Sequence, residues 1–184
     1  MTNQLPHPYL MTLGFDPATF ERLDRLRGRY FPADRNQVPA HLSLFHQLPG
    51  DDGDVIDRAL RDATRARGPI PLAFPSVKRM ARGVMAVVEA PGLAPLRSRL
   101  AQAFAHRLTP QDRQPFRPHV TLMNKAERGE VDLAFEALQA SWSPWDGAGD
   151  RIILWRYLGG PWEEVQDYAL THHPEPATPP RPEG

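Results

Sequence analysis

The sequence contains no cysteine and no long hydrophobic run. Not one of its 184 residues is cysteine, which excludes disulfides, thiolate metal sites and cysteine nucleophiles. No stretch approaches the roughly 18 apolar residues of a membrane span. The first 15 residues also lack the basic and apolar regions of a signal peptide. We therefore expect a soluble, cytoplasmic protein with no membrane partner, and we expect it to be a monomer.

Lysine is scarce, and the net charge is zero. Arginine supplies 20 of the 22 basic residues, and 22 acidic residues balance them, which argues against a general nucleic-acid coat. The charges are nevertheless segregated, with −2 over residues 1–64, +9 over 65–126 and −7 over 127–184. The basic block indicates either a local anion site or ordinary solvated arginine, because blocks in sequence need not form patches on a surface.

Hydrophobic residues make up 41% of the chain, enough for one compact core. The last residues, "HHPEPATPPRPEG", are rich in proline and almost free of apolar side chains. Such a composition is typical of disorder. We predict a single two-lobed domain over residues 1–171 and a disordered tail over 172–184.

Two segments of the chain repeat the order strand, helix, strand. Apolar periodicity predicts the first over 7–16, 17–31 and 41–48, and the second over 83–90, 93–108 and 119–126. Further helices are predicted near 54–67 and 130–140, and further strands near 70–80, 150–158 and 163–170. The repeat predicts two lobes related by an approximate two-fold axis.

One short motif occurs in the last strand of each half. The first motif, His41–Phe45, reads "HLSLF", and the second, Arg117–Met123, reads "RPHVTLM". Residues i and i+2 of a strand share a face, so each motif pairs an imidazole with a hydroxyl above an apolar backing. A two-fold axis would bring both pairs, His41 with Ser43 and His119 with Thr121, to one cleft.

Two histidines and two hydroxyls around one anion suit phosphodiester cleavage. The reaction needs a general base, a general acid and donors for the phosphoryl oxygens. Near pH 7 one imidazole can be neutral while its partner is protonated. Ser43 and Thr121 would donate to the non-bridging oxygens.

The sequence resembles the two-histidine (2H) phosphoesterase superfamily, in particular its 2′-5′ RNA ligase-like group. The resemblance rests on "HLSL" at 41–44, "FRPHVTLM" at 116–123 and the repeated strand-helix-strand order. It implies a bilobal α+β fold in which two mainly antiparallel sheets line a central cleft and helices lie outside. It also implies chemistry on 2′,3′-cyclic phosphates or 2′-5′ linkages of RNA without metal or cofactor. His41 would be the proton donor and His119 the acceptor.

The second motif departs from the usual pattern of the family, which often has arginine where this chain has Asn124 followed by Lys125. Arg117 could supply the missing phosphate contact through its guanidinium, although a plain surface arginine fits the position equally well.

Aromatic side chains near the motifs are candidates to stack on a base, and a role in the core is the alternative for each. Phe45 has the parity of His41 and Ser43, and Phe116 and Trp155 are further candidates. His46 has the opposite parity, so the pattern predicts that it does not join His41.

Other functions remain open at this point. A metal site would need ligand spacing that the seven histidines do not show. A binding module that keeps the fold without catalysis, or an enzyme acting on another cyclic or 2′-5′ linked nucleotide, would carry the same motifs. The preferred prediction is hydrolysis of a 2′,3′-cyclic phosphate to a 2′-phosphate, with weak ligation as its reverse.

Overall fold

The computed structural model describes residues 7–65 and 67–170. The first half-unit comprises β1 (Tyr9–Phe15), α1 (Pro17–Tyr30) and β2 (Leu42–Leu48), and α2 (Gly53–Thr64) and β3 (Ile70–Phe74) follow it. The second comprises β5 (Gly83–Val87), α3 (Leu93–Ala103) and β6 (His119–Met123). The remaining elements are β4 (Val77–Met80), α4 (Arg128–Ser141), β7 (Trp145–Tyr157) and β8 (Trp162–Ala169). The predicted tail 172–184 lies outside the described residues.

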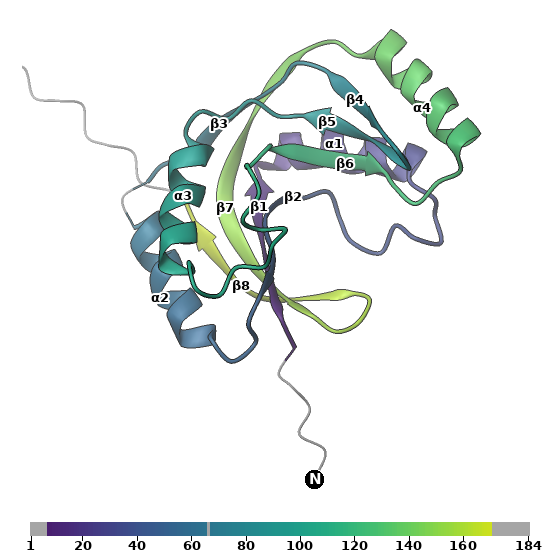
Figure 1. Ribbon diagram of the computed structural model, residues 1–184. Helices are drawn as coiled ribbons and strands as arrows, with labels where there is room; N and C mark the ends of the chain where they lie inside the picture. Colours follow the sequence, from purple (N-terminus) through teal and green to yellow (C-terminus); the bar gives the residue numbers. More distant parts are fainter. Residues whose placement is uncertain (1–6, 66, 171–184) are drawn as a thin grey trace, which may run out of the picture.

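The larger sheet is built around the long, curved strand β7 (Figure 1). Its order is β2-β1-β7-β3, and β8 also pairs with β7. Strand β7 is 13 residues long, and two strands pair with the same edge of it. Strand β3 pairs with residues 145–149 and β8 pairs with residues 151–157. All of these pairs are antiparallel. The first motif therefore lies on β2, at an edge of this sheet.

The smaller sheet has the order β4-β5-β6 and is also antiparallel. The sequence predicted one strand over 70–80, and this prediction is wrong. Pro75 and Ser76 separate β3 from β4, which belong to different sheets. Proline cannot donate to a strand ladder, which makes such a break favourable. The second motif lies on β6, at an edge of the smaller sheet.

The helices of the two half-units are exchanged between the sheets. Helix α1, which follows β1, packs against β6 of the other sheet. Helix α3, which follows β5, packs toward β2, where Phe104 just beyond its end meets Phe45 edge-on at 5.6 Å. Helix α4 covers β4 and β5, and α2 lies beside α3 (Figure 1). The exchange places β2 and β6 against each other, with helices outside, which confirms the predicted α+β class.

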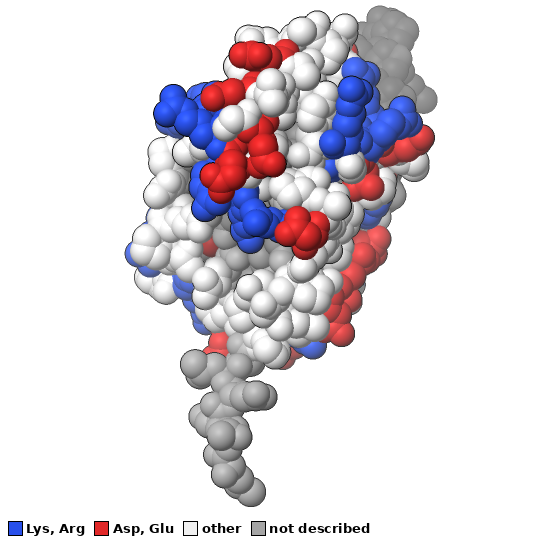
Figure 2. All heavy atoms as spheres, turned by 90° about the vertical axis from the view of Figure 1, so that its right-hand side faces the viewer, with Lys and Arg blue, Asp and Glu red and all other residues white. Residues whose placement is uncertain are grey.

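Charged side chains of the basic block are distributed among acidic partners. Arg79 forms an ion pair with Asp132 at 2.6 Å, and Arg107 pairs with Asp52. One face of the molecule accordingly shows basic and acidic groups interspersed (Figure 2). The segregation of charge seen in the sequence does not persist on this face. In the described part of the chain, no helix is long and apolar enough to cross a membrane.

Candidate active site

Both motif strands carry a β-bulge at the same place. Thr12 pairs with Ser43 but Met11 pairs with Phe45, so Leu44 is an extra residue in β2. In the same way Met85 pairs with Thr121 but Val84 pairs with Met123, so Leu122 is an extra residue in β6. A bulge interrupts the alternation of faces along a strand. The internal repeat therefore extends to the residue after each hydroxyl.

The bulge at Leu44 overturns one prediction made from strand parity. Phe45 has no exposed surface and packs in the core, so it cannot stack on a base as predicted. A further register shift lies between Phe45 and Leu48, and His46 and Gln47 are both exposed there. His46 lines the same hollow as Ser43, whereas His41 borders a neighbouring one.

The two motif histidines are held in the same way. Nδ1 of His41 lies 2.7 Å from the carbonyl oxygen of Pro39, and Nδ1 of His119 lies 2.8 Å from that of Arg117. A carbonyl oxygen only accepts, so each Nδ1 carries the proton of the neutral ring. Nε2 is then the nitrogen that can take up a proton, or donate one once it is charged. Each backbone contact spans two residues, which repeats the symmetry of the motifs.

Aromatic side chains pack beside His41. Trp162, which the sequence analysis did not single out, packs its ring 4.7 Å from the His41 ring, and Trp155 lies next to Trp162 at 6.0 Å. Burial lowers the pKa of His41 to about 4, and the positive charges of Arg27, His46 and His119 act in the same direction. In the unliganded protein His41 is therefore neutral at pH 7.

A hollow of about 290 Å³, hereafter the motif hollow, opens between β2, β6 and the loop that precedes the second motif. Its lining includes Ser43, His46, Arg97, Phe116, Arg117 and His119. His41 borders a neighbouring hollow of about 180 Å³ together with Thr12 and Trp155. Thr121 is half-buried on β6, two residues after His119.

Asp112 anchors the loop to β2. This carboxylate is 1% exposed and accepts hydrogen bonds from the backbone N–H groups of His46 and Gln47 at 2.8 and 3.1 Å. It also accepts from the Thr109 hydroxyl at 3.1 Å and from Nδ1 of His46 at 3.0 Å. Burial raises the pKa of Asp112, but these hydrogen bonds outweigh burial and lower it below its usual value. Asp112 is therefore an ionised carboxylate that fixes the His46 ring.

Two arginines in equivalent helices tie the lobes together. Arg27 in α1 donates to the carbonyl oxygens of Thr121 and Val38 at 2.5 and 2.9 Å. Arg97 in α3 donates to the carbonyl oxygens of Asp112 and Leu44. Each arginine thus joins the loop before one motif to the strand of the other. The sequence analysis missed both residues, since arginine at helical spacing ordinarily indicates an exposed face.

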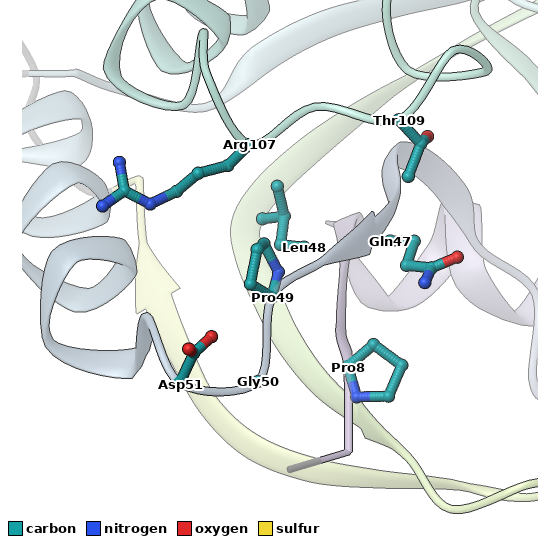
Figure 3. A pocket seen from close by; sticks show the side chains of 8 residues that line it. All are labelled: Pro8, Gln47, Leu48, Pro49, Gly50, Asp51, Arg107 and Thr109. Carbon is teal, nitrogen blue, oxygen red and sulfur yellow. The ribbon is translucent and has the colours of Figure 1, made fainter. Parts of the chain in front are cut away.

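A separate hollow of about 370 Å³ lies beyond the end of β2 (Figure 3). Gln47 and Thr109 line one side of it, and Pro8, Leu48 and Pro49 supply apolar walls. It contains none of the site residues predicted from the sequence. The motif hollow, in contrast, is lined by Ser43, Arg117 and His119, which favours it as the candidate site, with His41 at the neighbouring hollow.

The structure places the other residues considered in the sequence analysis in different surroundings. Phe116 is half-buried and lines the motif hollow. Trp155 is 8% exposed, and its Nε1–H donates to Thr12 Oγ1 at 2.8 Å, which places it in a wall. Lys125 occupies a left-handed turn with a φ of 58°, and its carbonyl accepts a hydrogen bond from Arg35. Among the described residues, no group of three or more His, Asp or Glu side chains could hold a metal ion.

Comparison with known proteins agrees with this architecture. The crystal structure of TT0787 from Thermus thermophilus aligns with a TM-score of 0.67 and 19% identity, covering 90% of this chain and 98% of that one. Escherichia coli LigT in complex with 3′-AMP aligns with a TM-score of 0.62 and 21% identity, covering 91% and 99%. LigT bound to NADP+ aligns with a TM-score of 0.59 and 20% identity, covering the same two shares.

No curated protein sequence matches the chain significantly. The sequence profile of the 2′-5′ RNA ligase superfamily, however, matches residues 15–161, which include both motifs. The two-histidine repeat, the paired antiparallel sheets and this match lead to one conclusion: the chain belongs to the 2′-5′ RNA ligase superfamily of 2H phosphoesterases.

Proposed function

We propose that the protein is a metal-independent phosphodiesterase that opens 2′,3′-cyclic phosphates at the ends of RNA or of nucleotides. The observation that carries the proposal is the matched anchoring of His41 and His119, each of which leaves Nε2 for proton transfer. Structures of LigT with 3′-AMP, ATP and NADP+ support a nucleotide ligand for this fold. We further propose that it acts as a monomer in the cytoplasm.

In the proposed reaction water attacks phosphorus opposite the 3′-oxygen. His119 Nε2 removes a proton from the water as the new P–O bond forms. The P–O3′ bond breaks, and His41 gives its Nε2 proton to the departing 3′-oxygen. The product carries a 2′-phosphate and a free 3′-hydroxyl. Ser43 and Thr121 donate hydrogen bonds to the non-bridging oxygens as their charge grows.

The low pKa of His41 places a condition on this assignment. His41 is neutral in the free protein at pH 7, because burial lowers its pKa to about 4. A bound phosphodiester is an anion, and a nearby negative charge favours the imidazolium. We propose that His41 takes up its proton together with the substrate. When a 5′-hydroxyl attacks the cyclic phosphate in place of water, the P–O3′ bond breaks in the same way and the product is a 2′-5′ linkage, which is the weak ligation that we propose.

The test is turnover of an oligonucleotide that ends in a 2′,3′-cyclic phosphate, in EDTA, with the position of the product phosphate assigned by NMR. We expect the wild type to release a 2′-phosphate and both His41→Ala and His119→Ala to lose at least about 100-fold in kcat. His106→Ala is the matched control, since His106 is exposed and outside the motifs. Wild-type protein without turnover, or full activity in either motif variant, refutes the proposal.

A further inference from the structure

The proposed reaction does not use His46, although this residue lines the motif hollow with Ser43 and His119. Its side chain is 42% exposed. His46 follows Ser43 by three residues on β2, which is up to about 10 Å along a strand. A ligand that extends from the reacting phosphate along β2 therefore reaches His46 within one nucleoside unit.

The ring of His46 is oriented by a buried group. Nδ1 lies 3.0 Å from Oδ1 of Asp112, and the backbone N–H of His46 donates to the same oxygen at 2.8 Å. Because the carboxylate only accepts, Nδ1 donates its hydrogen, and Nε2 is the nitrogen left for a ligand. When the ring is protonated, Nε2–H is a charge-assisted donor of fixed direction.

The groups that surround His46 favour an anion. Arg117 is exposed and lines the same hollow, and its carbonyl holds His119. The guanidinium of Arg97 lies 5.3 Å from the Phe116 ring and donates to backbone carbonyls. The one acidic side chain in the lining, Asp112, is turned to His46, Thr109 and the backbone.

We propose that His46 and Arg117 form a binding site for a second phosphate group, separated from the reacting phosphate by one nucleoside. This inference rests on the proposed function, because it takes the two motifs as the site of the reacting phosphate. The second phosphate is either the next phosphodiester of an RNA chain or a free 5′-phosphate. His46 binds it through Nε2–H, Arg117 binds it through the guanidinium, and Asp112 is a positioning residue.

The test compares three substrates: a nucleoside 2′,3′-cyclic phosphate, its 5′-phosphorylated form, and a dinucleotide ending in the cyclic phosphate. The readout is the ratio of kcat/KM for each of the last two to that for the first. We expect the wild type to prefer a substrate with a second phosphate by about tenfold or more, as one charge-assisted contact provides. His46→Ala and Arg117→Ala should each reduce that ratio. His106→Ala and Arg113→Ala are the matched controls, because both residues are exposed.

Each outcome has a defined meaning. No turnover of any substrate refutes the proposed function, whereas turnover with equal kcat/KM for all three refutes only the second phosphate site. A preference for the dinucleotide alone identifies the phosphodiester of RNA, and a preference shared by the 5′-phosphate identifies any phosphate. A preference that survives in His46→Ala and Arg117→Ala places the second phosphate elsewhere and overturns the inference. Calorimetric binding of adenosine 3′,5′-bisphosphate against 3′-AMP repeats the comparison without catalysis.

Discussion

Protonation of His41 should destabilise the fold, and the size of the effect follows from its burial. The pKa of His41 is about 4 in the folded protein and about 6.5 when the chain is unfolded. Between these values the unfolded chain binds a proton that the folded protein does not. Stability contributed by neutral His41 is therefore complete above about pH 6.5 and is lost as the pH falls toward 4.

The magnitude can be worked out for one convenient interval. For these two pKa values, the linkage relation gives a loss of about 2 kcal/mol between pH 7.5 and pH 5. The assay is urea unfolding of the wild type and of His41→Gln at both pH values. The free energy of unfolding of His41→Gln is subtracted from that of the wild type at each pH. Groups that titrate alike in the two proteins cancel in this difference. We expect the wild type to lose about 2 kcal/mol relative to His41→Gln on acidification.

His106→Gln provides the control, since His106 is exposed and should show no such difference. The reasoning is refuted if the free energy of unfolding of the wild type and that of His41→Gln differ by the same amount at pH 7.5 and at pH 5. That result would mean that Trp162 and the strands around His41 do not keep water from the ring. The experiment needs no substrate, so its outcome is independent of the proposed reaction.

Two further predictions concern the scaffold that holds the motifs. Arg27→Met should lower the free energy of unfolding by about 3 kcal/mol, because Arg27 is 3% exposed and the half-buried carbonyls of Thr121 and Val38 lose their donor. In urea unfolding Arg25→Met, at a residue 73% exposed in the same helix, should change stability by less than about 1 kcal/mol; equal losses would contradict this. A Cβ at Gly83 would lie 1.9 Å from the carbonyl oxygen of Met123. Gly83→Ala should therefore cost roughly 3 kcal/mol and disturb β6, whereas Gly129→Ala, with open space in α4, should stabilise by about 0.5 kcal/mol. Thermal unfolding of both variants checks the pair, and a neutral Gly83→Ala would count against the close packing of β5 and β6.

The pairing of a histidine with a hydroxyl in each motif could be predicted from the sequence because it is local. His41 with Ser43 and His119 with Thr121 are each two residues apart on a strand, and alternation alone puts each pair on one face. The order of elements in each half predicted the repeat, and the resemblance to the 2H superfamily implied the α+β class. Neither inference required knowledge of which strands are neighbours.

Tertiary structure decided what surrounds those four residues. The extra residues Leu44 and Leu122 arise from pairing with β1 and β5, so strand parity failed at Phe45. The contact of Trp162 with His41 joins residues 121 positions apart. Asp112 reaches His46 across 66 positions. A periodic pattern reports only which face a residue shares with its neighbours in sequence. The burial that sets the pKa of His41 and the carboxylate that orients His46 come from distant segments, and only the folded chain brings them together.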